Sequence, residues 1–290
     1  GSVSDHPLLL DVPATAPAKP VFETSPETDA FFAAVSSGRS VFLTGPAGTG
    51  KSFLVRECLA QRRQSGLPTE ITASTGIAAL TIGGMTLHRW SGMMLGPRDG
   101  QTNAAYFNEQ QADTRMSVRR GVNRIRSARF LFIDEISMMP GRALDYFDYQ
   151  CRKLRETDAP FGGIQVVATG DFLQLPPVAK NGAAYDWAFL CPAWANAGFV
   201  VIELRKIHRQ VGDPGFAEAL AAFRVGDIAR GAALRLRSCV RNFPPADLTR
   251  LYTHNSMVDN WNSSRLGQID GESRTFEADL SGPPHQQESL

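Results

Sequence analysis

The stretch "SVFLTGPAGTGKS", residues 40–52, joins an apolar run to a glycine-rich loop that ends in Lys51 and Ser52. Its last eight residues match the phosphate-binding pattern of four residues between two glycines, followed by Gly-Lys-Ser. Glycines let the backbone wrap an anion, so that its N–H groups and the next helix N-terminus face the phosphates. The predicted nucleotide contacts are Gly45, Pro46, Ala47, Gly48, Thr49, Gly50, Lys51 and Ser52.

Single side chains in this region have separate expected roles. Lys51 is expected to reach the β- and γ-phosphates and Ser52 to bind Mg²⁺, which makes ATP and Mg²⁺ the predicted cofactors.

A second apolar run, "RFLFIDE" at residues 129–135, ends in two acids. A carboxylate at the end of a buried strand is costly unless it meets a cation, so Asp134 is predicted to hold the Mg²⁺. Glu135 would then polarise the attacking water; alternatively, both acids cap a helix N-terminus.

Apolar strand patterns alternate with helical patterns along the first two thirds of the chain. The predicted strands are residues 40–45, 69–74, 129–135, 163–171 and 199–204, and the predicted helices are residues 25–38 (with Ser25 as N-cap), 51–66, 76–80 and 141–156. This order predicts an α/β fold with a parallel sheet and helices on both faces. Because ligands bind beyond the carboxyl ends of such strands, the polar residues there are expected to share one crevice.

The character changes after residue 205. Helical patterns cover residues 213–227, 227–238 and 255–266, and a strand pattern covers residues 248–254. Residues 1–20 are rich in proline and alanine and are predicted to be a flexible N-terminal segment. Residues 21–205 are therefore expected to form one domain, and residues 206–290 to begin a second domain with a disordered tail.

Composition limits the possible classes of protein. The 290 residues carry a formal net charge of +1, so any basic nucleic-acid surface must be local. The four cysteines are far apart, which predicts buried thiols in a reducing compartment and neither a disulfide framework nor a metal site. No apolar run approaches membrane-spanning length, and the expected protein is intracellular and has no membrane partner.

The stretch "PFGGIQVVATGDFLQLPPV", residues 160–178, is the most discriminating part of the chain. Together with "DEISMM" at residues 134–139 and "FDYQCRKLR" at residues 147–155, it resembles the superfamily-one (1B) DNA helicases of the petite-integration-frequency (Pif) family, which are RecD-like. The similarity runs from about residue 24 to about residue 270. It implies a RecA-like P-loop NTPase motor domain in residues 21–205, followed by a partial second RecA-like domain.

The resemblance also implies an activity and partners. An ATP-dependent helicase of this family moves 5′ to 3′ on single-stranded DNA and couples ATP hydrolysis to duplex unwinding. The implied partners are single-stranded DNA and tailed or structured duplex DNA, the implied state is monomeric, and the implied processes are DNA repair, recombination and telomere maintenance. The compartment would be the cytoplasm in bacteria or phage, and the nucleus or mitochondrion in a eukaryote.

Site residues are carried over by position in the matching motifs. Gln174 is expected to sense the γ-phosphate, and Arg209, from "ELRKIHRQ", to neutralise charge in the transition state. The predicted DNA contacts in "ITASTGIAAL" and "TLHRWSG" are Ser74, Thr75, Thr86 and His88. Two features allow alternatives: Trp90 either stacks a base or packs under the loop, and the arginine-rich residues 115–129 either line a DNA path or form a solvated helix face. Residues 93–117 are assigned as a small wedge used in strand separation.

Two features depart from the family pattern. Thr28 occupies the position of the glutamine that usually reads adenine, and its hydroxyl lacks the paired donor and acceptor of an amide. Weak discrimination between ATP and other nucleotides is expected. The later motor motifs do not follow residue 270, so we expect a fragment that binds nucleotide and DNA but unwinds poorly. The alternative is a nucleotide-binding regulatory or scaffold protein without unwinding activity.

Overall fold

The computed structural model describes residues 24–94, 96–179, 183–206, 214–231, 249–272 and 274–275. The chain divides into two compact units, residues 1–238 and 239–290. The predicted N-terminal segment 1–20, Arg209, Cys239 and the end of the predicted helix 227–238 beyond residue 231 lie outside the described residues. The predicted domain boundary after residue 205 stays a prediction.

The first unit is built on one six-stranded, all-parallel sheet, which confirms the predicted fold class. In sheet order the strands are β3 (Met85–Thr86), β2 (Glu70–Ala73), β4 (Phe130–Asp134), β5 (Gln165–Thr169), β1 (Val41–Thr44) and β6 (Val200–Glu203). The five predicted strands are all present. The two-residue strand β3 was not predicted, and it exists because Met85 and Thr86 pair with Thr72 and Ala73 of β2.

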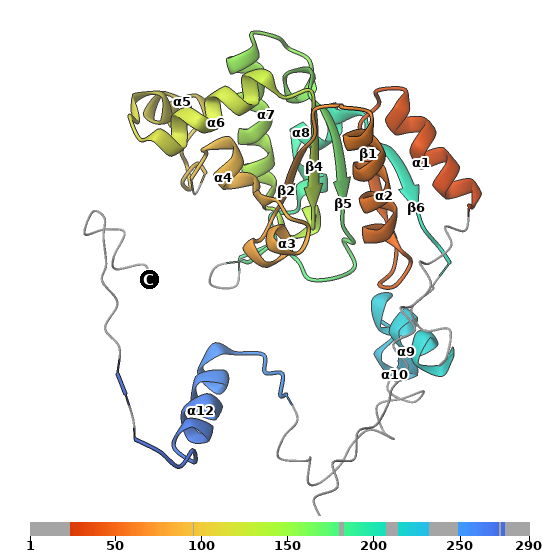
Figure 1. Cartoon of the computed structure of the whole chain (residues 1–290), viewed down its shortest axis with the longest axis vertical. Helices are drawn as coiled ribbons and strands as arrows, with labels where there is room; N and C mark the ends of the chain where they lie inside the picture. Colours follow the sequence, from red (N-terminus) through yellow and green to blue (C-terminus); the bar gives the residue numbers. More distant parts are fainter. Residues whose placement is uncertain are drawn as a thin grey trace, which may run out of the picture. The chain divides into compact units, whose positions relative to one another are not determined.

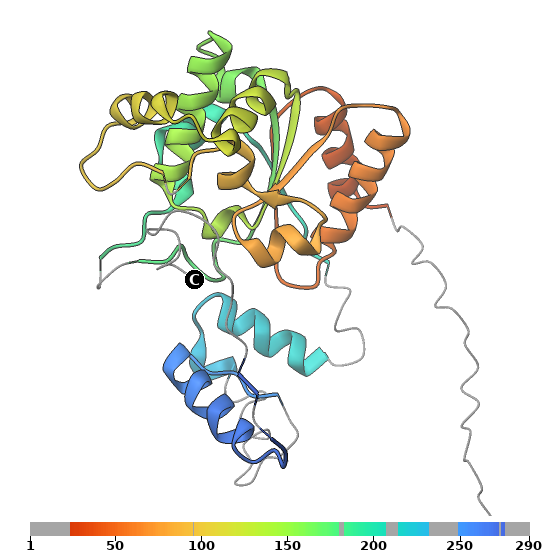
Figure 2. The same cartoon turned by 60° about the vertical axis from the view of Figure 1, so that its left-hand side comes forward.

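Helices cover both faces of this sheet, as predicted (Figure 1). One face carries α1 (Pro26–Ser36) and α2 (Lys51–Gln64). The other carries α4 (Leu87–Ser91), α5 (Asn103–Ala112), α6 (Met116–Ser127), α7 (Gly141–Arg155) and α8 (Pro192–Ala197). The two groups stay on opposite sides in the turned view (Figure 2).

Alternation along the strands creates a separate core on each face. In β4, Phe130 and Phe132 join the core under α1 and α2, whereas Leu131 and Ile133 join the core under α7. Successive side chains of a strand point to opposite faces, and a sheet covered on both sides needs apolar residues at every position. Both cores therefore hold the sheet rigid, and its strand ends provide a fixed base for a site.

Helix caps fix several of the turns that leave the sheet. Ser25 caps α1, with Pro26 in the first turn, as the sequence predicted. Thr75 caps the short helix α3 (Gly76–Thr81), and Thr86 caps α4. Each cap hydroxyl accepts a hydrogen bond from a free N–H of its first turn.

The open choice for Trp90 is resolved by its burial. Its side chain has no exposed surface, and its indole N–H donates to Glu70 Oε2 over 2.7 Å. It packs in the core against Phe147, with ring centroids 6.1 Å apart. Packing under the loop is therefore confirmed, and base stacking by Trp90 is wrong.

The arginine-rich stretch forms one amphipathic helix, α6. Val118 and Ile125 are buried, while Arg119, Arg120 and Arg126 are exposed, as a solvated face requires. Arg124 is different, because its guanidinium donates to the carbonyls of Arg89 and Trp90 and thereby closes the end of α4.

The later part of the chain contributes short helices. Helices α9 (Pro214–Arg224) and α10 (Ile228–Gly231) lie in the first unit, and α12 (Asn255–Leu266) lies in the second. The predicted strand 248–254 is wrong over its described residues 249–254, which form no ladder. A strand needs a partner for its N–H and C=O groups, and the described residues of the second unit supply none. Among the described residues, no helix is long and apolar enough to span a membrane.

Candidate functional site

The loop between β1 and α2 is shaped by glycines. Gly45, Gly48 and Gly50 have φ values of 142°, 82° and 91°, where side chains are disfavoured. A Cβ on Gly45 would lie 2.3 Å from the carbonyl oxygen of Leu204, so no larger residue fits there. Helix α2 starts after Gly50 without a side-chain cap, which leaves its first N–H groups to face an anion.

Lys51 lies over this loop from the first turn of α2. Its ammonium donates to the carbonyl oxygens of Gly45 at 2.6 Å and Pro46 at 3.1 Å. Burial lowers the pKa of Lys51, and the nearby carboxylates of Asp171 and Glu135 partly offset that effect. The lysine therefore belongs to one electrostatic cluster with the acids that follow β4 and β5.

The two acids after β4 are held differently. Asp134 Oδ1 accepts from the backbone N–H of Glu135 at 3.0 Å and from the hydroxyl of Thr169 at the end of β5. Glu135 has left-handed backbone angles of φ 52° and ψ 42°, a conformation that costs on the order of 1–3 kcal/mol for a non-glycine residue. Burial and the Asp134 charge raise the pKa of Glu135, whereas Lys51 lowers it. This carboxylate is thus a more basic group than an exposed glutamate.

These positions suit a magnesium ion bound together with a nucleotide. Mg²⁺ at such sites takes one or two protein oxygen ligands and completes its shell with phosphate and water. Asp134 offers a fixed carboxylate, and Ser52 offers an exposed hydroxyl in the first turn of α2. Among the described residues, no group of three or more His, Cys, Asp or Glu side chains forms a metal site by itself.

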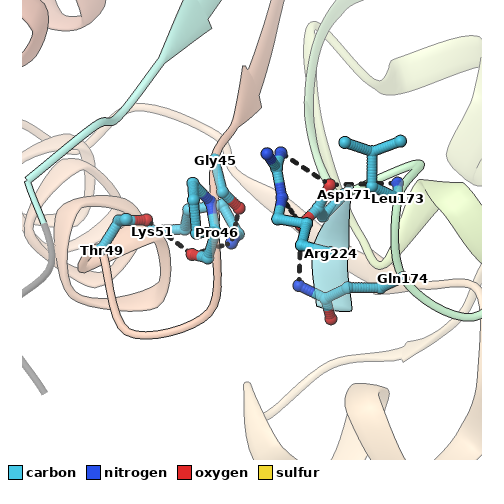
Figure 3. Close-up of polar contacts among 8 residues, drawn as sticks. All are labelled: Gly45, Pro46, Thr49, Lys51, Asp171, Leu173, Gln174 and Arg224. Carbon is cyan, nitrogen blue, oxygen red and sulfur yellow. Dashed lines mark hydrogen bonds and ion pairs between the residues drawn. The ribbon is translucent and has the colours of Figure 1, made fainter. Parts of the chain in front are cut away.

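The loop after β5 brings a third set of groups to the same edge. Asp171 is 2% exposed, and its carboxylate accepts from Leu173 N–H at 3.1 Å and Gln174 Nε2 at 3.0 Å. Arg224 of α9 completes the set with two hydrogen bonds of 2.9 and 3.1 Å. Burial opposes the ionisation of Asp171, but the hydrogen bonds from Arg224 and Gln174 outweigh it and lower its pKa. Figure 3 shows this set opposite Lys51 and the phosphate loop.

Phe172 anchors this loop from below. Its ring lies in an aromatic cluster with centroid separations of 5.4 Å to Phe42, 4.8 Å to Phe189, 5.4 Å to Trp194 and 6.1 Å to Trp187. The side chains of these two neighbouring residues thus point in opposite directions: Phe172 packs into the core, and Asp171 bonds to α9. The backbone between them has little freedom to move without disturbing both.

The predicted DNA contacts lie at the other end of the same edge, after β2 and β3. Thr75 and Thr86 use their hydroxyls as helix caps, and His88 is half-buried, which lowers its pKa. The Ser74 hydroxyl donates to the carbonyl oxygen of Glu135 at 2.6 Å, and Ser74 N–H donates to the carbonyl of Asp134 at 3.0 Å. Ser74 therefore ties the predicted DNA segment to the backbone of the two acids.

The predicted wedge, residues 93–117, contains helix α5. Tyr106 donates to the carbonyl of Met93, and the buried amide of Gln110 donates to the carbonyl of Gly92 at 2.7 Å. Tyr146 of α7 donates to Gln110 in turn. The segment is thus bonded to the domain at its base, and its role as a wedge stays a prediction.

Three residues of the site were not predicted. Thr169 and Asp171 bond directly to the predicted residues Asp134 and Gln174, and Arg224 bonds to Asp171. The polar residues after the apolar run of β5 pointed to Thr169 and Asp171, because parallel neighbours end at the same edge. Arg224 lies 53 residues beyond Asp171, and the sequence contains no pattern that pairs the two.

The glycine loop before a helix, the strand-end Asp-Glu pair and the all-parallel sheet define a RecA-like P-loop NTPase domain. A profile of the PIF1-like helicases matches residues 25–228. The chain belongs to the PIF1-like helicase family.

Individual relatives agree with this assignment. The chain is 36% identical over 257 residues to the ATP-dependent DNA helicase Pif1 of a Psychrobacter species, covering 86% of this chain and 38% of that protein. The crystal structure of Candida albicans Pif1 helicase superposes with a TM-score of 0.72 at 35% identity, over 87% of this chain and 56% of that one. A Bacteroides Pif1 helicase in complex with ADP-AlF3 and ssDNA gives 0.70 at 28% identity, over 87% and 58%. The chain thus spans less than two thirds of the length of these relatives.

Proposed function

We propose that this chain is the motor part of an ATP-dependent DNA helicase that couples ATP hydrolysis to 5′-to-3′ translocation on single-stranded DNA and to duplex unwinding. The observation that carries the proposal is the order of residues along the sheet edge. In the order of the sheet, the predicted DNA segment follows β2, Asp134 ends β4, Gln174 follows β5 and Lys51 follows β1.

The chemistry is divided among the strand ends. Lys51 and the loop N–H groups hold the phosphates, and Mg²⁺ on Ser52 and Asp134 would neutralise their charge. Glu135 accepts a proton from the attacking water, and its raised pKa favours that role at neutral pH. Gln174 orients the water or the γ-phosphate. Arg209, outside the described residues, would add positive charge in the transition state.

The DNA side uses the segment after β2 and β3. Ser74, Thr75, Thr86 and His88 are proposed to contact single-stranded DNA, and two of the structural neighbours are Pif1 helicases described with ssDNA or forked dsDNA. We propose that single-stranded and tailed or structured duplex DNA are the partners, that the motor acts as a monomer inside the cell, and that it serves DNA repair, recombination or telomere maintenance.

Unwinding is proposed to need more than these 290 residues. A motor of this class works by closing two domains around the nucleotide, and the relatives are longer than the region they share with this chain. The 290 residues are therefore expected to bind nucleotide and DNA and to unwind a tailed duplex poorly. Unwinding of such a duplex at the rate of the complete gene product would contradict this point.

The test compares ATP hydrolysis with and without single-stranded DNA in the complete gene product. Glu135→Gln is expected to lower the DNA-stimulated kcat by at least about 100-fold, because it removes the proton acceptor, while the Kd for ATP stays close to that of the wild type. Glu156→Gln is the matched control, since Glu156 has the same φ of 52° but ends α7 and is exposed.

Two outcomes would contradict the proposal. Hydrolysis that DNA does not stimulate in the wild type would favour a nucleotide-binding scaffold protein. Equal hydrolysis by the wild type and Glu135→Gln would remove the role assigned to Glu135.

A further inference from the structure

A buried ion pair connects the loop after β5 to helix α9. The side chain of Asp171 is 2% exposed and that of Arg224 is 19% exposed. The guanidinium engages both carboxylate oxygens, Nε to Oδ2 at 2.9 Å and Nη2 to Oδ1 at 3.1 Å. A two-point pair of this kind fixes direction as well as distance. Without Arg224, the Asp171 carboxylate would remain buried without its cation, which is strongly unfavourable.

The same carboxylate orients the amide of Gln174. Asp171 Oδ2 accepts from Gln174 Nε2 at 3.0 Å as well as from Arg224 Nε. An ionised carboxylate only accepts hydrogen bonds, so the amide must turn its nitrogen toward Asp171. Its oxygen then lies on the side away from Asp171 (Figure 3), where the amide can meet a water or a phosphate oxygen.

Helix α9 faces the phosphate loop across a pocket. The pocket has a volume of about 260 Å³ and is lined by Pro46 and Ala47 of the phosphate loop, by Gln174 of the loop after β5 and, as its α9 wall, by Leu220 and Phe223 among others. The helix that supplies this wall also supplies Arg224. A displacement of α9 would therefore change the pocket and release Asp171 in one step.

We infer that Arg224 is a positioning residue for nucleotide hydrolysis: it acts through Asp171 to orient Gln174. Hydrolysis therefore depends on the position of α9 against the loop after β5. The inference rests on the proposed function, since it concerns the same hydrolytic site. Helix α9 follows β6 after residues 204–213, the part of the sequence that contains Arg209. A displacement of α9 would thus reach Gln174 through the ion pair between Arg224 and Asp171.

The test uses Arg224→Gln and Arg224→Lys in the complete gene product with saturating single-stranded DNA. For Arg224→Gln we expect kcat to fall by at least about 10-fold with KM and the Kd for ATP little changed, because the variant loses orientation and not binding. The Tm should fall as well, because Asp171 is left buried without its cation. Arg224→Lys should recover part of kcat, since lysine restores the charge without the two-point geometry. Arg230→Gln is the matched control: Arg230 forms an exposed ion pair with Glu218 on the same helix pair.

A double-mutant cycle with Asp171→Asn decides whether Arg224 acts through Asp171. The double variant should be no slower than Asp171→Asn alone, because the second change removes a partner already lost. Multiplied losses in kcat, an unchanged kcat in Arg224→Gln, or a loss of ATP affinity that matches the loss of kcat would each overturn the inference. A wild-type protein that binds ATP but does not hydrolyse it would overturn the proposed function instead, which keeps the two failures distinct.

Discussion

Thr28 shows how one hydroxyl can be fully occupied by local structure. It accepts from the N–H of Ser25 and donates to the carbonyl of Ser25, both at 2.8 Å, while Ser25 Oγ accepts from Thr28 N–H at 3.3 Å. This reciprocal arrangement is a capping box at the start of α1. The hydroxyl proton of Thr28 is therefore already used in this capping box, and Thr28 offers a nucleobase no free donor.

The expected consequence at Thr28 is weak selection among nucleotides. We predict that kcat/KM for GTP lies within about 10-fold of that for ATP, because no amide reads the base edge. Thr28→Gln should raise the preference for ATP, since glutamine is also favoured at this capping position and leaves α1 intact. Thr28→Glu is the control, because it preserves the cap without an amide. A GTP turnover 100-fold below that of ATP in the wild type would contradict the prediction.

Elements differ in how far their own residues specify them. Strands β1, β4 and β5 were predictable because each is a buried apolar run bounded by polar residues, which is typical of a central parallel strand. Strand β3 was not predictable, since its two residues carry no pattern and depend on pairing with β2. The strand predicted for residues 249–254 is absent for the opposite reason: the local pattern favours a strand, but no partner strand lies among the described residues.

The residues of the candidate site also differ in whether the sequence alone could predict them. Lys51, Asp134, Glu135 and Gln174 were predictable because their motifs are continuous stretches of sequence. The pairing of Asp171 with Arg224 was not predictable, because it exists only after α9 packs against the loop. Contacts between segments far apart in the chain leave no mark in either segment alone.

The contact between α6 and α4 gives a prediction at the level of helices. A Cβ on Gly121 would lie 2.4 Å from the backbone carbonyl of Ser91, so a methyl group forces the helices apart. We predict that Gly121→Ala lowers the free energy of unfolding by about 1–3 kcal/mol, despite the helix propensity that alanine adds. Chemical denaturation measures the effect. Gly76→Ala is the matched control, with no atom within 4 Å of the added methyl, and an equal loss there would contradict the packing argument.

Across the whole molecule, the cores on both faces of the sheet protect the thiols. Burial raises the pKa of Cys58 to about 11 and that of Cys191 to about 12, and it also raises the pKa of Cys151. All three are buried, as predicted for a reducing compartment. The thiolate needed for reaction is therefore scarce at neutral pH.

The prediction for these thiols uses a Cys239→Ser variant, because Cys239 lies outside the described residues. The native variant should react with a disulfide reagent at pH 8 at least about 100-fold more slowly than the same chain in guanidinium. Three equivalents should react after unfolding. One fast equivalent in the native state would show that a core opens.

The sheet edge also sets the relation between the two proposed activities. Nucleotide residues follow β1, β5 and β4, and the proposed DNA residues follow β2 and β3, in one continuous order. The hydrogen bond from Ser74 to the carbonyl of Glu135 crosses the boundary between them. Because Glu135 holds a disfavoured backbone conformation, a ligand that moves Ser74 can alter the angle at which the carboxylate is presented.

The aromatic cluster beneath Phe172 gives this protein an internal optical signal. Two of its four tryptophans, Trp187 and Trp194, touch the ring of a residue that is covalently bonded to Asp171. Indole emission responds to small changes in neighbouring dipoles and packing, so a shift of the loop would alter the fluorescence without any added label. Trp90, buried on another part of the same face, supplies a steady background. A shift of the loop after β5 can thus be followed in real time by the intrinsic fluorescence of Trp187 and Trp194.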